Sequence, residues 1–236
     1  MPAFARVALP GVPYHVTQRG NYRQEVFFRP EDRAVYLQFV TKSARLHGLE
    51  LHGWCLMSNH VHWIVVPTDK KAMADSFRQA HSQYSVYINQ AEKRKSGHLW
   101  QGRYYSCPLD NAHFGAALLY VERNPARAGL VRVACDYLWS SAAARVGLTP
   151  VPGFLRLEPW ARQYSAGEWR SLLEGNANPE VEQRVRVSTQ QGKPCGSEDF
   201  VTEMEGRVGR ELKVRAVGRP RNQENTQKAD GGSLNP

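Results

Sequence analysis

The sequence has few cysteines, and they form no pattern that indicates a zinc site or a redox pair. The four cysteines of the 236 residues stand far apart in the chain, as Cys55, Cys107, Cys135 and Cys195. Pairs of the Cys-x-x-Cys type are the usual mark of both kinds of site. We therefore expect four reduced thiols that are buried or incidental.

Other familiar patterns are missing as well. No apolar stretch approaches the roughly 20 residues of a membrane-spanning helix. The first residues lack the charged, apolar and small-residue regions of a secretory signal. There is no Walker-type glycine loop and no internal repeat. These absences predict a cytoplasmic protein that has no membrane partner and does not hydrolyse nucleotides.

Positive charge is in clear excess. The chain has 31 Lys and Arg against 22 Asp and Glu, which gives a formal net charge of +9. The planar guanidinium of arginine binds phosphate oxygens through two hydrogen bonds and also stacks on bases. The chain also has 10 tyrosines and 6 tryptophans, several beside basic residues, and aromatic rings are the usual platforms for bases. The composition therefore favours a nucleic-acid partner over an inert basic surface.

Hydrophobic periodicity predicts alternating strands and helices. Pro30 and Gly48 are suited to the two ends of the first helix, and an apolar stripe from Met73 to Ile88 supports the second. The predicted elements are strand 14–18, helix 31–47, strand 49–56, the strand of His60, helix 71–91 and strand 99–107. This βαββαβ order predicts an α+β, ferredoxin-like fold, an antiparallel sheet with helices on one face. A further helix, 111–124, lies outside the minimal fold and ends or kinks at Asn124-Pro125.

The chain divides into three expected parts. A catalytic domain covers 1–146, and a helical or linker region covers 147–191, where prolines become frequent. Residues 192–236 are expected to be a basic, largely disordered DNA-binding tail, with one small helix at 198–208. Arg219 stands in a Gly-Arg-Pro sequence that resembles a minor-groove hook. A merely basic, disordered end fits the same residues.

His60-Val61-His62 is the most informative stretch. Two imidazoles at i and i+2 project from the same face of a strand and can hold one divalent metal, although such a pair also arises by chance. Tyr120 and Asn124, at i and i+4, share one face of the predicted helix 111–124. A hydroxyl nucleophile and an amide oxygen could thus be presented together, and this ligand set suits Mg²⁺ or Mn²⁺. From these residues alone, an ordinary core aromatic on the helix face is the slightly favoured interpretation of Tyr120.

Three segments together resemble the HUH single-tyrosine (Y1) transposases, and among them the REP-associated tyrosine transposases, which are IS200-like. They are Met-Ser-Asn-His-Val-His at 57–62, Ser-Gly-His-Leu-Trp-Gln-Gly-Arg-Tyr at 96–104, and 119–131, which contains Tyr120 and Asn124-Pro125. The resemblance extends over roughly 4–146. It implies a metal-dependent single-stranded DNA endonuclease and strand-transferase that acts on hairpin or repeat DNA.

The resemblance also implies roles for the site residues. Tyr120 would attack the phosphate to give a 5′-phosphotyrosine and a free 3′-hydroxyl. His60 and His62 would hold the metal, Mg²⁺ or Mn²⁺. Asn124 would be the third ligand, where insertion-sequence members commonly have the longer Gln. The protein would act as a monomer or a homodimer.

Further residues are expected at a DNA interface. The arginines would bind phosphates or guanine edges and the aromatic rings would stack on bases, although core packing fits Trp100 equally well. The expected set is Arg19, Asn21, Trp100, Arg103 and Tyr104. His98 is expected to support structure or DNA, and the remaining histidines show no ligand spacing and are expected to be ordinary: His15, His47, His52, His81 and His113. The alternative function is a non-catalytic regulator that binds structured nucleic acid through a vestigial site.

Overall fold

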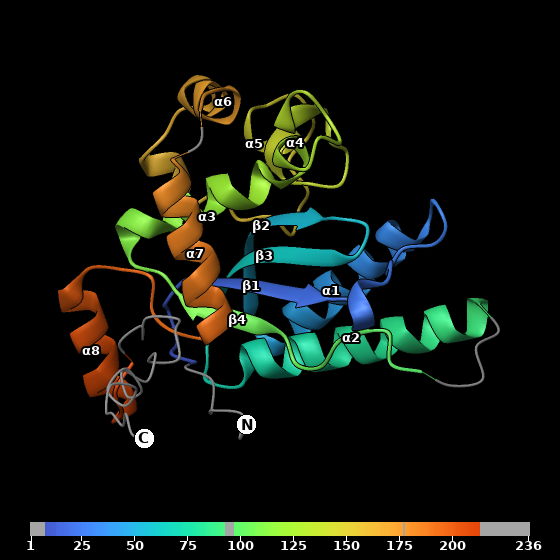
Figure 1. Cartoon of the computed structure of the whole chain (residues 1–236), viewed down its shortest axis with the longest axis horizontal. Coiled ribbons are helices and arrows are strands. Elements are labelled where there is room, and N and C mark those ends of the chain that lie inside the picture. Colours follow the sequence, from blue (N-terminus) through green and yellow to red (C-terminus); the bar gives the residue numbers. More distant parts are fainter. Residues whose placement is uncertain (1–7, 93–96, 177, 213–236) are drawn as a thin grey trace, which may run out of the picture.

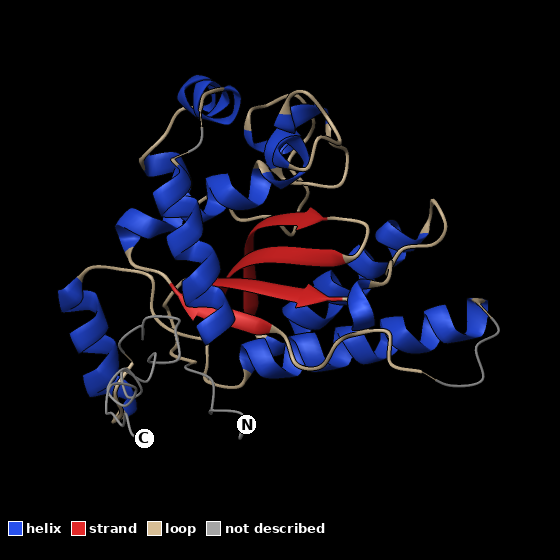
Figure 2. Cartoon of the chain, viewed as in Figure 1, coloured by secondary structure: helices blue, strands red, loops and turns tan. Residues whose placement is uncertain are grey.

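A four-stranded antiparallel sheet forms the centre of the molecule. The computed structural model describes residues 8–92, 97–176 and 178–212. The strands are β1 (Tyr14–Arg19), β2 (Leu49–Leu56), β3 (His60–Pro67) and β4 (Tyr105–Pro108), in the order β2-β3-β1-β4 (Figure 1, Figure 2). Helix α1 (Asp32–His47) lies between β1 and β2 in the chain, and α2 (Ala72–Ala91) lies between β3 and β4. The predicted ferredoxin-like βαββαβ fold is confirmed.

The last predicted strand is too long at its beginning. Of the expected 99–107, the part from Tyr105 onward forms the continuous pairing with β1, whereas Trp100 makes an isolated bridge to Gly20 and the Gln101 amide donates to the Arg19 carbonyl. Gly102 adopts φ +151, a backbone conformation that residues with side chains rarely take. The backbone changes direction there, so the two halves of the predicted segment cannot form one continuous strand.

Helices α1 and α2 pack together on one face of the sheet. Val61, Trp63 and Val65 point to this face because alternate residues of a strand project the same way. The helices contribute Tyr36, Val40, Met73, Phe77 and Tyr84 to the same core. Gly48 ends α1 in the left-handed conformation, φ +69, as the sequence indicated.

The opposite face is covered too. It is packed by α3 (Asn111–Glu122), α6 (Ala166–Glu174) and α7 (Pro179–Gln191). Their side chains meet the other alternate set of strand residues, which includes Cys55, Ile64 and Cys107. The sequence indicated helices on one face only, because a split βαβ unit supplies no helix for the second.

The remaining elements are short. They are α4 (Asn124–Arg127), α5 (Ala142–Arg145), α8 (Glu198–Val208) and the 3₁₀ turns η1 (Asn21–Arg23), η2 (Ala134–Asp136) and η3 (Trp160–Arg162). All four cysteines are free and buried, as expected. Within the described ranges, no helix has the length and apolar character needed to cross a membrane.

The described part of the expected tail is folded. The predicted helix 198–208 is present as α8, and Met204 and Leu212 are buried in the core that α1 and α2 share. The Cys195 amide donates to the Pro108 carbonyl at 2.8 Å, which ties the segment to the end of β4. The prediction of a largely disordered tail is therefore wrong for residues 192–212, because this segment buries apolar side chains. Arg219 lies outside the described residues, and the three-part division stays a prediction.

Candidate active site

Tyr120 of α3 lies against two histidines on the face of the sheet opposite α1 and α2. Its ring meets those of His62 and His15 edge-on, with centroids 5.8 and 5.6 Å away. The ring of His60 is 4.9 Å from that of His62. Tyr120 is nearly buried, with 7% of its surface exposed. The structure thus brings the expected nucleophile and the expected histidine pair together.

Strand register explains why His15 joins the pair. In the antiparallel pairing of β1 with β3, Thr17 is opposite His62 and His15 is opposite Ile64. His15 is therefore a diagonal neighbour of His62 on the same face. The two rings stack with centroids 5.1 Å apart. The expectation that His15 is an ordinary histidine is therefore wrong, because its ring contacts His62, and only the pairing of the two strands brings them together.

Asn59 determines how the ring of His60 is held. Asn59 Nδ2 donates to the Arg23 carbonyl at 3.2 Å, so its Oδ1 accepts from His60 Nδ1 at 2.6 Å. Burial, with the charges of Arg19 and Arg127, lowers the pKa of His60 to about 4. The ring is therefore neutral at pH 7, and its Nε2 keeps a lone pair for a metal.

His62 is held in a similar way. Its Nδ1 is 2.9 Å from Nε2 of His15, and both rings are buried. Burial is the main cause that holds the pKa of His62 well below its ordinary value, and it lowers the pKa of His15 to about 3. Both rings are neutral at pH 7. Metal-binding histidines usually have their second nitrogen fixed in this way by a neighbouring group.

A metal bound by His60 and His62 would need a third ligand of a type other than aspartate, glutamate, histidine or cysteine. Among the described residues, no cluster of three or more such side chains could hold an ion. Asn124 is buried, with 5% exposed, and its Nδ2 has no hydrogen-bond partner within the described part of the chain. An unpaired buried polar atom costs about 1–3 kcal/mol, so a bound partner for this carboxamide would be favourable. A turn of the carboxamide would exchange its nitrogen and oxygen.

The chain bends at Asn124 as the sequence indicated. Helix α3 ends at Glu122 and α4 begins at Asn124, with Pro125 in its first turn. The contacts of the described residues join Tyr120 to the histidine rings but include none between the Asn124 carboxamide and either member of the pair. The residue types nevertheless suit Mg²⁺ or Mn²⁺, which accept imidazole and amide oxygen beside ligands from a substrate.

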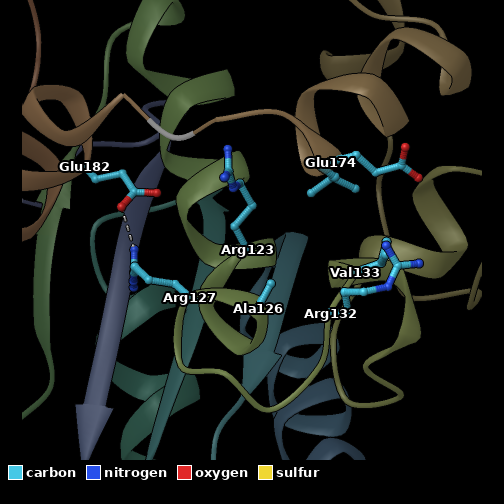
Figure 3. A pocket seen from close by; sticks show the side chains of 8 residues that line it. Arg123, Ala126, Arg127, Arg132, Val133, Glu174 and Glu182 are labelled. Carbon is cyan, nitrogen blue, oxygen red and sulfur yellow. Dashed lines mark hydrogen bonds and ion pairs between the residues drawn. The ribbon is translucent and has the colours of Figure 1, made fainter.

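Arg127 covers one face of Tyr120. Its guanidinium carbon lies 4.3 Å from the ring centroid, and its NH1 is paired with Glu182 of α7 at 3.1 Å. Figure 3 shows this pair at the edge of a cavity of about 420 Å³. The lining includes three arginines, Arg123, Arg127 and Arg132, against Glu174 and Glu182, so positive charge exceeds negative in this cavity.

Comparison with known proteins identifies the segment that carries this site. A family model described as "Transposase IS200 like" matches residues 9–124. Residues 9–124 belong to the IS200-like transposase family. The resemblance inferred from the three sequence segments is thereby confirmed. No curated protein matches the chain.

Two solved structures are similar to this transposase-like protein. The structure of a REP-associated tyrosine transposase bound to a REP hairpin aligns with a TM-score of 0.54 and 19% identity, over 66% of this chain and 92% of that one. A putative transposase from Deinococcus radiodurans aligns with a TM-score of 0.33 and 21% identity, over 51% of this chain and 95% of the other. The first likeness supports the fold assigned above.

Two of the expected DNA-binding residues of the transposase domain are in the core. Trp100 and Tyr104 are each only 8% exposed. The Trp100 ring packs 4.8 Å from His81, and its Nε1 donates to the His81 carbonyl, while Tyr104 packs 5.2 Å from Phe77. The expectation that these rings stack on bases is wrong, because core side chains already occupy their surroundings.

The other expected interface residues are accessible to different degrees. Arg19 is half-buried on β1, opposite His60. Asn21 is half-buried in η1, and Arg103 is exposed. These three residues remain candidates for contacts to nucleic acid.

Tyr22, beside Asn21 in η1, is an exposed aromatic residue that no pattern in the sequence predicted at the interface. The residue is 93% exposed, and its backbone adopts φ +50, which non-glycine residues rarely do. Asn59, the residue before His60, accepts from the Gly20 amide and donates to the Arg23 carbonyl, which holds the turn beside the histidine strand. A single tyrosine in a predicted turn gives no signal of its exposure.

Proposed function

We propose that this protein is a metal-dependent single-stranded DNA endonuclease and strand-transferase with Tyr120 as its nucleophile. One observation carries the proposal. The Tyr120 ring contacts His62 on one face of the sheet, where the hydrogen bond of His60 to Asn59 leaves Nε2 of His60 for a metal. A phenol next to such a pair suits attack on a phosphodiester.

Each residue of the site would have a separate role in cleavage. His60, His62 and Asn124 would hold Mg²⁺ or Mn²⁺, which when bound neutralises charge on the phosphate. The Tyr120 oxygen forms a bond to phosphorus as the bond from phosphorus to the 3′ oxygen breaks. The phenol loses its proton and the 3′ oxygen gains one. The products are a 5′-phosphotyrosine and a free 3′-hydroxyl.

Rejoining would reverse this step. A 3′-hydroxyl attacks the phosphotyrosine, and Tyr120 leaves as the phenol. The covalent link keeps the energy of the phosphodiester, so the reaction needs no nucleoside triphosphate.

Hairpin or repeat DNA is the proposed substrate. The relative of known structure was solved with a REP hairpin, and this chain shares its fold. Arg19, Asn21 and Arg103 would contact the strand, and Arg219 would add a contact from the tail. The exposed ring of Tyr22 would stack on a base in place of the buried Trp100 and Tyr104.

The test is a covalent-adduct assay. Labelled hairpin oligonucleotides with single-stranded flanks are incubated with the protein and Mn²⁺ or Mg²⁺, then separated on a denaturing gel. The wild type should form a protein-DNA adduct, and Tyr120→Phe should form none while still binding the hairpin. Tyr84→Phe is the matched control, because the Tyr84 hydroxyl donates to the Val26 carbonyl in the opposite core.

Each outcome has a separate meaning. An adduct that persists in Tyr120→Phe would show that another residue is the nucleophile. Binding without an adduct on any hairpin would favour the non-catalytic regulator.

A further inference from the structure

A buried hydrogen-bond chain joins α7 to the histidine pair. Oγ1 of Thr189 lies 2.7 Å from Nδ1 of His15, and Nε2 of His15 lies 2.9 Å from Nδ1 of His62. Thr189 and His15 are each 1% exposed, and His62 is 4% exposed. Thr189 lies outside the segment matched by the transposase family, 9–124.

The proton positions along this chain follow from the threonine. A hydroxyl has one proton, and that of Thr189 is donated to the Val185 carbonyl at 2.7 Å. Thr189 Oγ1 must therefore accept from Nδ1 of His15. A neutral His15 then has a bare Nε2, which accepts from Nδ1 of His62. His62 in turn keeps its lone pair on Nε2.

We propose that Thr189 is a positioning residue that, through His15, selects the tautomer of His62 that binds metal. This inference rests on the proposed function for the role of the metal. It assigns part of the site to the C-terminal extension, beyond the transposase-family segment. Without the threonine hydroxyl, Nδ1 of His15 loses its acceptor, and the order of donors and acceptors is no longer imposed.

The docking of α7 supports this role. Asn178 caps its first turn, Gly192 ends it in the left-handed conformation, and Glu182 pairs with Arg127. The helix also contacts β1, β4 and α3, and Figure 1 shows it crossing α3 near one end of the strands. Thr189 is therefore held in place from both ends of its helix.

The test compares two substitutions of Thr189. Thr189→Val keeps the shape of the side chain but removes the hydroxyl, whereas Thr189→Ser keeps the hydroxyl. Ser188→Ala is the control for a buried hydroxyl on the same turn that lies outside the chain of bonds. The first readout is ¹⁵N NMR of the imidazole nitrogens in metal-free protein. His62 should carry its proton on Nδ1 in the wild type, Thr189→Ser and Ser188→Ala, and should populate both tautomers in Thr189→Val.

The second readout is Mn²⁺ binding by calorimetry. Loss of the group that orients a metal-binding histidine typically weakens metal binding about 10–100-fold. Thr189 acts on His62 through His15, so Thr189→Val should raise the Kd by the lower end of this range, about tenfold. Thr189→Ser and Ser188→Ala should bind Mn²⁺ like the wild type.

Two results would overturn the proposal. One is a wild-type His62 protonated on Nε2, a measurement that needs no variant and holds even where Thr189→Val does not fold. The other is a folded Thr189→Val with unchanged tautomer and Mn²⁺ affinity. Failure of the adduct assay with the tautomer as predicted would instead count against the proposed function alone.

Discussion

Glu122 is expected to be among the most costly single positions to change in this protein. Its carboxylate is fully buried, two residues after Tyr120, and Oε1 lies 2.8 Å from Nε of Arg145, which is also buried. Oε1 accepts from Ser141 at 2.5 Å, and Oε2 accepts from Trp169 Nε1 at 2.8 Å. These bonds tie the end of α3 to the segments of α5 and α6.

The expected loss follows from leaving a buried charge alone. Glu122→Gln keeps the size of the side chain but removes the charge that balances Arg145. Breaking a buried ion pair on one side costs about 3–5 kcal/mol. Domains of this size have a total free energy of unfolding of about 5–15 kcal/mol. The variant should therefore lose a large part of its stability.

The assay is urea unfolding at 25 °C, followed by tryptophan fluorescence and circular dichroism. The control is Glu203→Gln, which removes an exposed pair with Arg207 on α8 at 3.3 Å and should cost at most about 1 kcal/mol. Replacing both partners, Glu122→Leu with Arg145→Met, should recover much of the loss, because no lone charge remains. A Glu122→Gln variant no less stable than Glu203→Gln would refute the reasoning.

Three further outcomes are expected. Tyr22→Ala should weaken hairpin binding, measured by fluorescence anisotropy, by about 1–3 kcal/mol for one lost base stack, and unchanged affinity would remove Tyr22 from the interface. Asn124→Ala should weaken Mn²⁺ binding in calorimetry, whereas equal affinity would show that its amide is no ligand. Burial lowers the pKa of His81 from 6.5 to about 3, so the unfolded chain binds the extra proton between these values. The contribution of His81 to the free energy of unfolding should therefore be fully present above about pH 6.5. It should fall by about 1.4 kcal/mol for each pH unit below that value, as for any such buried histidine. His81→Gln should reduce the slope of urea stability between pH 6.5 and 4, and an unchanged slope would contradict this assignment.

The sequence by itself determined what depends on neighbours along the chain. Periodicity predicted the βαββαβ order, because the repeats of helices and strands are local properties. The i, i+2 spacing put His60 and His62 on one face of β3, and the bend at Asn124-Pro125 was visible from the proline. The motifs that surround these residues were sufficient to indicate the family, which the match over 9–124 supports.

The tertiary structure decided what depends on residues far apart in the chain. Strand register brought His15 to His62 across 47 residues, and the docking of α7 brought Thr189 to His15 across 174. Burial removed Trp100 from the expected interface, because the aromatic cluster of α1 and α2 encloses its ring. Register, docking and burial are set by the packing of whole elements, and no local pattern in the sequence specifies which distant side chains will meet.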